Sequence, residues 1–381
     1  GGAGAQSVEV KGYQAPEYLA QPEVTEQSRR MPSALDNQII VDFNPDQQEQ
    51  PQQAKEAIAK AILSLQDELD ISTYELKEQD LITILEMALP SQYPLAMEMD
   101  SYAYGISRSD GYVKYIKFQY PYEKSVMEKR NEQTEQAISA VLARINPEMT
   151  ELQKIKAVHD YLVSTVAYDL ENLQNETIGR TSYTAYGALV EGKAVCEGYS
   201  RAMQLLLHKA GIECTLVSGA GKKTGVAHMW NLVTIDGRNY HVDATWDDSD
   251  DVLRHNYFNL TTEQIEISHR LDKDNIGGDT CTATEANFFV HGKTYLHTYK
   301  QDDIAAVIAQ QVRLGKDAVE MRFSDDTYGN AAVFFRQTKV LTAKVNALLK
   351  DAGLAMWEYE VRGEPDEKIL SLYKKGAYPK G

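Results

Sequence analysis

The chain has 381 residues, of which 43% are apolar, and its formal net charge is −17. This length and apolar content allow two or three folded domains, while the acidity argues against a surface for nucleic acid or anionic membranes, which needs basic residues. The chain contains three cysteines and no apolar run near the roughly 20 residues of a membrane helix, so neither a disulfide framework nor a transmembrane segment is expected.

Residues 1–53 are predicted to be a disordered segment or tether. They are rich in Gln, Pro, Glu and Asp, as in the run NPDQQEQP at 44–51, and cannot bury enough apolar surface to offset the entropy of ordering. The chain begins with glycine where an initiator methionine would stand, and we interpret this as the place from which an export signal was removed. We therefore expect the protein to be extracellular or anchored at the cell surface, with a cytoplasmic location as the alternative.

Residues 54–148 are predicted to form a small α/β domain. A helix is expected over 54–69, where apolar residues recur on one helical face. Two strands, 102–106 and 112–118, alternate with period two, and the Asp-Gly pair between them is typical of a hairpin turn. A second helix is expected over 132–144, and the Asn146-Pro147 pair that follows would end it.

The chemistry of the chain is expected in residues 149–275, where a helix over 151–166 precedes Cys196. A second helix is predicted to begin at Cys196, because an apolar stripe follows at helical spacing and Gly211 supplies a stop. The unpaired N–H groups and the macrodipole of a helix N-terminus stabilise an anion. Cys196 is therefore placed where a cysteine can be held as a reactive thiolate.

A hairpin downstream of this helix brings two further residues together. Strands are predicted over 227–235 and 238–246, joined by the turn residues Asp236-Gly237. A two-residue turn pairs Ile235 with Arg238, and this register makes His228 and Asp243 diagonal neighbours on one face, about 7 Å apart. An imidazole and a carboxylate so placed are the base and the orienting group that a nucleophilic cysteine needs.

Two metal sites are alternatives to this interpretation. The same register places His241 on the face of His228 and Asp243, and two imidazoles with a carboxylate suit zinc, but this set leaves Cys196 without a role. The acidic run 247–251 could offer oxygen ligands to calcium, yet it lacks the spacing of a calcium loop. We expect no metal and no cofactor.

Residues 276–381 are predicted to be a small α/β module with no chemical motif of its own. Apolar periodicity predicts strands over 287–290, 318–323 and 356–361, and helices over 303–313 and 331–349. The sequence shows no internal repeat, P-loop or paired-cysteine zinc motif, so function has to be sought in the central domain.

Five segments of the central region carry a family resemblance. They are HDYL at 159–162, VCEGY at 195–199, HMWN at 228–231, YHVDATWD at 240–247 and YFNL at 257–260. Over about residues 151–272 the chain resembles the transglutaminase-like superfamily of papain-like cysteine enzymes. The resemblance implies an α+β fold, with a papain/transglutaminase-like core in which the nucleophile helix packs on an antiparallel sheet, flanked by the small N- and C-terminal modules.

The resemblance also implies roles for individual residues. Cys196 would be the nucleophile, His228 the general base and then acid, and Asp243 the residue that orients the imidazole. The oxyanion would be held by the backbone N–H of Cys196 and by Tyr186. Three residues are expected beside the site: Trp230, His241 and Thr245.

The implied reaction is attack of a thiolate on an amide carbonyl, which gives a thioester. We expect a cysteine peptidase or amidase whose partner is a peptide or protein substrate, including cell-wall peptide, and not nucleic acid. The alternatives are a true protein-glutamine transglutaminase and a non-catalytic cell-surface interaction module.

Overall fold

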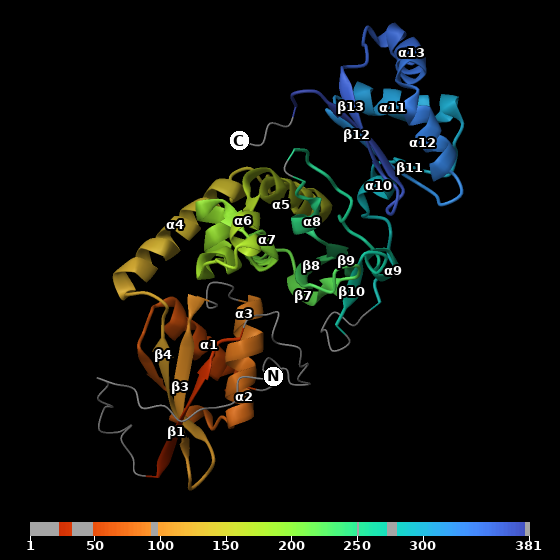
Figure 1. Cartoon of the computed structure of the whole chain (residues 1–381). Coiled ribbons are helices and arrows are strands. Elements are labelled where there is room, and N and C mark those ends of the chain that lie inside the picture. Colours follow the sequence, from red (N-terminus) through yellow and green to blue (C-terminus); the bar gives the residue numbers. More distant parts are fainter. Residues whose placement is uncertain (1–22, 33–48, 93–97, 250, 273–279, 378–381) are drawn as a thin grey trace.

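The structure is a computed structural model that describes residues 23–32, 49–92, 98–249, 251–272 and 280–377. These residues form three mixed helix-and-sheet modules, and the central one lies between the other two in Figure 1. Each module has its own four-stranded sheet and its own cluster of buried apolar residues. The predicted α+β class is therefore confirmed. Within the described ranges no helix is both long enough and apolar enough to cross a membrane.

The N-terminal module packs its helices against a sheet with the strand order β1-β3-β4-β2. The predicted hairpin is present as β3 and β4, and buried Ile58 of α1 packs in one core with Tyr104 and Ile116 of these strands. The elements are β1 Val24–Arg30, α1 Glu49–Leu63, β2 Glu68–Asp70, η2 Ser72–Tyr74, α2 Glu78–Thr83, η3 Ile84–Ala88, α3 Leu89–Gln92, β3 Ser101–Ser107 and β4 Val113–Gln119.

The predicted tether over residues 1–53 is wrong for part of its length. Strand β1 pairs antiparallel with β3 along its whole length, from Val24 opposite Ser107 to Arg30 opposite Ser101. The sequence of β1 has no apolar alternation that would have predicted a strand. The strand is held instead by main-chain pairing and by ion pairs from Glu26 and Arg29. Helix α1 also begins before residue 54, at Glu49, and the rest of the tether, 1–22 and 33–48, lies outside the described residues.

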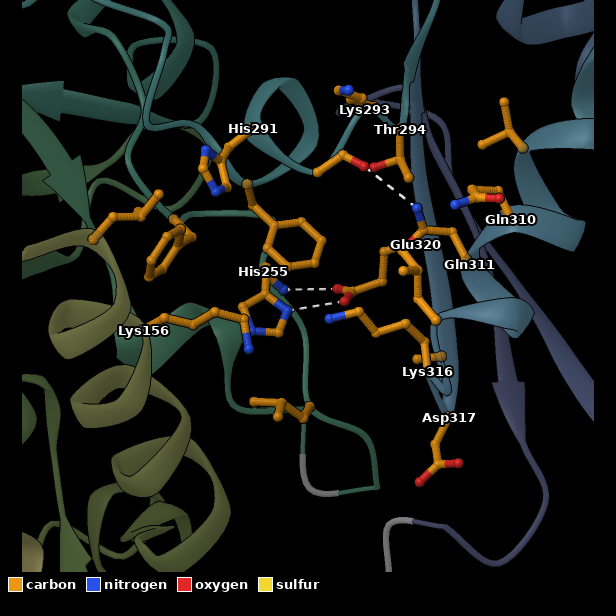
Figure 2. Close-up of a pocket in the computed structure, with 18 of the residues that line it drawn as sticks. Lys156, His255, His291, Lys293, Thr294, Gln310, Gln311, Lys316, Asp317 and Glu320 are labelled. Carbon is orange, nitrogen blue, oxygen red and sulfur yellow. Dashed lines mark hydrogen bonds and ion pairs between the residues drawn. The ribbon is translucent and has the colours of Figure 1, made fainter. Parts of the chain in front are cut away.

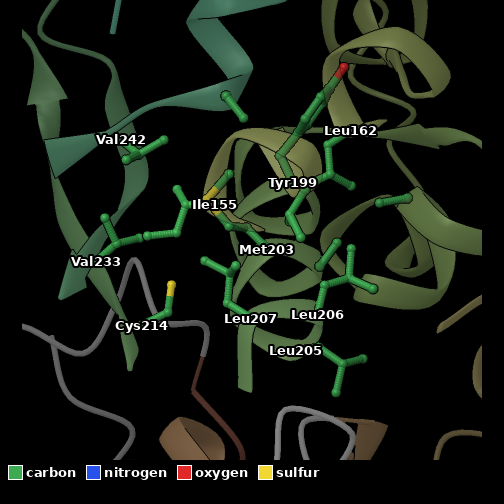
Figure 3. Close-up of a cluster of buried hydrophobic side chains, with 14 of the residues drawn as sticks. Ile155, Leu162, Tyr199, Met203, Leu205, Leu206, Leu207, Cys214, Val233 and Val242 are labelled. Atoms are coloured by element: carbon green, nitrogen blue, oxygen red, sulfur yellow. The ribbon is translucent and has the colours of Figure 1, made fainter. Parts of the chain in front are cut away.

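The central module packs helix α7 on an antiparallel sheet with the strand order β10-β7-β8-β9. Figure 3 shows Met203 and Leu207 of α7 gathered with Val233 and Val242 of the sheet in one buried cluster. The elements are α4 Lys124–Leu142, α5 Glu151–Thr165, β5 Ala167–Tyr168, α6 Leu170–Gln174, η5 Arg180–Tyr183, η6 Gly187–Glu191, β6 Lys193–Ala194, α7 Cys196–Lys209, β7 Cys214–Gly221, β8 Ala227–Ile235, β9 Arg238–Val242, α8 Ala244–Asp247, α9 Thr262–Ile265 and β10 His269–Leu271. The implied core, a nucleophile helix packed on an antiparallel sheet, is confirmed.

The β8–β9 hairpin has the predicted register, with Ile235 opposite Arg238 and Asn231 opposite Val242. The predicted second strand is wrong beyond Val242, because α8 begins there instead. The side chain of Asp243 accepts the backbone N–H of Trp246 at 3.1 Å and so caps this short helix.

The C-terminal module has the strand order β11-β12-β14-β13, and its helices cover this sheet (Figure 1). Its elements are α10 Phe288–His291, β11 Tyr295–Leu296, α11 Gln301–Arg313, β12 Ala318–Phe323, α12 Tyr328–Arg336, α13 Thr338–Leu349, η7 Lys350–Ala352, β13 Tyr359–Glu364 and β14 Ile369–Lys374. The strand predicted over 287–290 is wrong, because Asn287 caps the helix α10 through the N–H groups of Phe289 and Val290. The helix predicted over 331–349 is two helices that meet at Gln337.

The predicted domain boundaries at 148/149 and 275/276 stay predictions. Ile138 and Val141 of α4 and Ala286 before α10 pack into the central core, so that core extends beyond both boundaries.

Candidate active site

Cys196 is the first residue of α7, as the apolar stripe predicted. The strand that leads to it is held on both sides by main-chain hydrogen bonds. Asp169 N–H donates to Ala194 C=O at 2.9 Å, and Val195 N–H donates to Ser182 C=O at 3.0 Å. Because the chain is fixed up to the residue before it, Cys196 enters the helix at a defined position and its sulfur lies at the positive end of the helix dipole.

Gly198, in the first turn of α7, is required by close packing. A Cβ atom at this position would lie 2.6 Å from the carbonyl oxygen of Ser182 and 2.7 Å from the Cβ of Ala194. Real Cβ atoms do not approach other atoms so closely, so only glycine lets the start of α7 lie against this segment.

His228 and Asp243 meet as the hairpin register predicted. Nε2 of His228 lies 2.6 Å from Oδ2 of Asp243, and the Cys196 side chain is near enough to the same ring to help raise its pKa. Since Nε2 is occupied by the carboxylate, Nδ1 is the ring nitrogen left for the sulfur. Cys196, His228 and Asp243 are 7, 6 and 0% exposed, so the three side chains form a nearly dry cluster.

The electrostatics of this cluster favour a charged imidazole. Burial by itself lowers the pKa of His228, but the charges and hydrogen bonds of Asp243 and Cys196 outweigh it and raise the pKa to about 10. Burial raises the pKa of Asp243, but the charge and hydrogen bonds of His228 and His269 outweigh it and hold that pKa well below its ordinary value. At neutral pH the site therefore contains an imidazolium and a carboxylate.

A second histidine, which sequence reasoning missed, also binds Asp243. Nε2 of His269 lies 2.7 Å from the same Oδ2 atom, and its Nδ1 lies 2.8 Å from the hydroxyl of Ser268. His269 is on the short edge strand β10, which pairs with β7. No sequence pattern pointed to it, because this three-residue strand joins the sheet through contacts with residues far away in the chain.

Two tryptophans enclose the imidazole of His228. The ring of His228 stacks on Trp246, with centroids 5.0 Å apart, and on Trp230, with centroids 5.9 Å apart. Trp246 also contacts His269 at 4.1 Å. Trp230 was expected beside the site and lies there, whereas Trp246 was not identified from the sequence. These rings exclude water from the hydrogen bonds of Asp243 and so strengthen them.

His241 was also expected beside the site, and it contacts the site through Trp230. Its Nδ1 accepts the indole N–H of Trp230 at 2.9 Å, and its Nε2 faces the hydroxyl of Thr262 at 3.3 Å. Burial and the nearby charge of His269 lower the pKa of His241 to about 4, so this ring is neutral. With both nitrogens engaged, His241 does not join His228 and Asp243 in the zinc set that was weighed from the sequence.

Thr245 and Tyr186 are not directed at the sulfur. Thr245 is buried in α8, and its hydroxyl has no hydrogen-bond partner in the part of the chain that the structure describes. The hydroxyl of Tyr186 lies 3.0 Å from Oε1 of Gln133, and its ring lies under the guanidinium of Arg130 at 3.9 Å. The proposed oxyanion role of Tyr186 stays a prediction, and its hydroxyl is directed toward α4.

Tyr168 and Tyr183 lie near Cys196. Strand pairing places Tyr168 opposite Ala194, two residues before Cys196. Burial, together with the nearby charges of Cys196, Tyr183 and Asp243, raises the pKa of Tyr168 to about 12. Burial and the charges of Glu197 and Cys196 also raise the pKa of Tyr183. Both phenols therefore keep their protons at neutral pH and remain hydrogen-bond donors beside the site.

Comparisons with known proteins agree on the central module. Residues 139–244, which include Cys196, His228 and Asp243, match the family model of the transglutaminase-like superfamily. The kyphoscoliosis peptidases of Mus musculus and Homo sapiens are each 28% identical to this chain over 107 residues, which are 26% of this chain. The match spans only 16% of the length of these curated relatives.

Two solved structures are similar to part of the chain. A crystal structure of a TGase has 17% identity and a TM-score of 0.28, and the match covers 35% of this chain and 41% of that one. A proposed cysteine protease from Cytophaga hutchinsonii has 15% identity and a TM-score of 0.24, with 38% and 53% covered. The family match over residues 139–244 and the observed core together show that the central module contains a transglutaminase-like domain.

Proposed function

We propose that the protein is a cysteine-dependent amide hydrolase that acts on peptides or proteins through a thioester. One observation carries the proposal: Nε2 of His228 lies 2.6 Å from the buried carboxylate of Asp243, and Cys196, the first residue of α7, is near enough to this ring to help raise its pKa. A cysteine at a helix N-terminus beside an imidazolium has the surroundings that stabilise a thiolate. The buried carboxylate behind the ring fixes its orientation and its charge.

In the first half of the reaction, the sulfur of Cys196 attacks the carbonyl carbon of the amide. The proton on Nδ1 of His228 passes to the leaving amine as the C–N bond breaks, and a thioester forms. Asp243 stays ionised throughout and holds Nε2–H of the ring.

In the second half, water attacks the thioester and the carboxylic acid product leaves. Acylation removes the negative charge of the sulfur, which is one of the influences that raise the pKa of His228. The imidazole can then accept a proton from the attacking water. The sulfur of Cys196 leaves as a thiolate, which restores its ion pair with His228.

The alternative is resolution of the thioester by an amine, which is transglutamination. Hydrolysis is preferred because water needs no acceptor site, and the relatives from mouse and human are named as peptidases. The third interpretation, a non-catalytic surface module, gives no reason for Cys196, His228 and Asp243 to lie together in one buried cluster.

The test is incubation with a glutamine-containing peptide and a fluorescent amine, followed by mass spectrometry of both products. We expect hydrolysed peptide and little labelled peptide, with all product lost in Cys196→Ala. Cys214→Ala is the matched control, since Cys214 is fully buried and burial raises the pKa of its thiol. Labelling that exceeds hydrolysis and depends on Cys196 would overturn the hydrolase in favour of the transglutaminase.

A second measurement addresses the non-catalytic alternative. We expect a thiol alkylating agent to modify Cys196 faster than Cys214, and His228→Ala to slow that modification. Equal rates at the two cysteines, unchanged by His228→Ala, would contradict an activated nucleophile.

We further propose that the substrates lie outside the cell, as surface proteins or cell-wall peptides. The support is the Gln- and Pro-rich N-terminal stretch of the sequence, which suits a tether to the cell surface. Fractionation of cells that produce the full gene product tests this, and recovery in the cytoplasm alone would contradict it.

A further inference from the structure

A second group of ionisable side chains is buried away from Cys196, between the central and C-terminal modules. Nδ1 of His159, on α5, lies 2.9 Å from Oδ1 of Asp160, and Nε2 of His255 lies 2.7 Å from the same oxygen. The side chains of His159, Asp160 and His255 are 0, 22 and 5% exposed. One atom from each, of a kind that binds metals, lies within 4.8 Å of the other two.

The outer nitrogen of each imidazole is held by another buried carboxylate. Nε2 of His159 lies 2.8 Å from Oδ2 of Asp247, and Nδ1 of His255 lies 2.9 Å from Oε2 of Glu320. Figure 2 shows the second pair, with Glu320 reaching His255 from strand β12. Histidines that bind metals typically donate their other N–H to a carboxylate in this way, because it sets the tautomer and the ring orientation.

The arrangement of this group suits a cation. Every ring nitrogen of His159 and His255 faces a carboxylate oxygen, and the two ring centroids lie 5.2 Å apart. The inner nitrogens of both rings share Oδ1 of Asp160 as their neighbour. A divalent cation at this oxygen would be bound by both rings as neutral imidazoles.

We propose that His159, Asp160 and His255 bind a divalent cation of the zinc class, with Asp247 and Glu320 orienting the two imidazoles. Two neutral imidazoles and one carboxylate are a ligand set typical of zinc, with a fourth position left for water. Nζ of Lys156 lies 2.7 Å from Oδ2 of Asp160, which leaves Oδ1 as the oxygen that faces the cation.

A cavity lies beside this group. A cavity of about 790 Å³ between the two modules is lined by His255 and Glu320, with Lys156 and Phe288 beside them (Figure 2). The ring of Phe288 stacks on His255 at 4.1 Å and covers one face of it. Solvent in the cavity therefore reaches the His255 side of the group.

The site would connect three parts of the molecule. His159 and Asp160 are on α5, His255 is in the segment before α9, and Glu320 belongs to the C-terminal sheet. Asp247 is the last residue of α8, and its N–H donates to the backbone carbonyl of Asp243 at 3.2 Å. A bound cation would thus fasten the C-terminal module to the central one and steady the helix next to the active-site carboxylate.

The experiment is a calorimetric titration of the chelator-treated full chain with Zn²⁺, repeated with Co²⁺ as an optical probe. The parent carries His228→Gln, because His228, Asp243 and His269 form another group that could hold a metal. We expect one equivalent of Zn²⁺ to bind, with release of protons, measured in buffers of different ionisation heat. The Co²⁺ form should show a visible spectrum typical of nitrogen and oxygen ligands.

Variants locate the binding. His255→Gln should abolish it, and Glu320→Gln should weaken it about 10- to 100-fold, because only an orienting acceptor is changed. His291→Gln is the matched control, since His291 lines the same cavity outside the group and should leave binding unchanged. Zn²⁺ should raise the melting temperature of the parent and of His291→Gln.

Three results would overturn the proposal: no stoichiometric Zn²⁺ binding to the parent, equal binding to His255→Gln, or tighter binding of Ca²⁺ or Mg²⁺ than of Zn²⁺. Circular dichroism checks that His255→Gln is folded. If it is not folded, Glu320→Gln decides, and undiminished binding there counts against the site.

Discussion

Asp243 holds the active site together because three groups converge on its carboxylate. Oδ2 accepts from Nε2 of both His228 and His269, and Oδ1 accepts the N–H of Trp246. The carboxylate is fully buried, so these bonds act in a low dielectric where each is stronger than in water. Its negative charge keeps His228 protonated, and its hydrogen bond to Nε2 leaves Nδ1 of that ring free for Cys196.

Replacement of Asp243 by Asn is expected to lower kcat/KM by about 10³- to 10⁴-fold, as loss of the orienting carboxylate does in serine proteases. The imidazolium donates the proton to the leaving amine, so activity of the parent should persist as pH rises and fall only near the His228 pKa of about 10. Without the carboxylate that pKa drops, and the alkaline limb of the pH profile should move to lower pH. A profile of kcat/KM against pH for a peptide amide measures this, and an unchanged limb would contradict the role.

His269 is expected to act as a positioning residue, through Asp243. His269→Ala removes a hydrogen bond to a buried carboxylate, so kcat should fall about 10- to 100-fold while KM stays the same. His269→Gln can still donate an N–H to Asp243 and should recover part of the loss. Steady-state kinetics of both variants test this, and equal losses in Ala and Gln would point to a merely structural role.

The part of the site that could be predicted is the part made by local contacts. His228 is on the first strand of a hairpin with a two-residue turn, and Asp243 directly follows the second strand. Because so short a turn allows the strands only one register, the proximity of the two residues follows from the sequence. His269 reaches the same carboxylate through a non-local strand pairing that no local pattern encodes. Trp246 was missed for a related reason, because the chain leaves the strand at Val242 and α8 turns its ring onto His228.

At the scale of elements, the N-terminus of α7 is shaped by its contact with residues 182–184. A Cβ atom added at Gly198 would lie 2.6 Å from the carbonyl oxygen of Ser182 and 3.1 Å from that of Thr184. Both carbonyls belong to backbone that cannot rotate away as a side chain could. The position of Cys196 two residues earlier therefore depends on the absence of a side chain here.

Gly198→Ala is expected to lower the free energy of unfolding by about 1–3 kcal/mol, the usual cost of forcing an extra carbon into a packed interior. The start of α7 must shift, so alkylation of Cys196 should also slow. Gly329→Ala in α12 is the matched control, because an added Cβ there meets nothing within 4 Å and alanine favours a helix. Chemical denaturation measures the free energy of unfolding of both variants. Equal stability of the two variants would contradict the close contact.

Elements with clear periodicity were predicted well, and those held by other means were not. Helix α5 and strand β12 match the predicted ranges because their apolar spacing is regular and their core residues are buried. Strand β1 has no such pattern and exists through main-chain pairing with β3. Residues 287–290 are apolar enough for a strand, but the cap at Asn287 turns them into α10.

At the scale of the whole molecule, the C-terminal module is attached to the central one by polar contacts. Arg254 and Asn256 both bind Glu364 of β13, and the hydroxyl of Tyr257 donates to Glu367 at 2.7 Å. Arg254 also donates to the backbone carbonyl of Trp246, whose ring stacks on His228. The same guanidinium therefore touches the docked module and the wall of the active site.

Glu364→Gln tests whether this attachment supports the site. Arg254 and Glu364 are each 18% exposed, and removal of the negative charge leaves a largely buried guanidinium without its partner. Stability should fall by about 1–3 kcal/mol, and limited proteolysis should cut between the modules sooner.

Lys223→Ala is the matched control for this variant, because Lys223 also bridges to the C-terminal module, through Asp366 at 2.8 Å, but both side chains are exposed. Exposed pairs contribute little, so stability and cleavage should stay as in the parent. A loosened Arg254 also releases the carbonyl of Trp246, so Glu364→Gln should lower kcat while Lys223→Ala leaves it unchanged. Weaker docking of Glu364→Gln with an unchanged kcat would contradict this link. The Arg254–Glu364 pair would then hold the C-terminal module, while aromatic packing alone would hold Trp246 against His228.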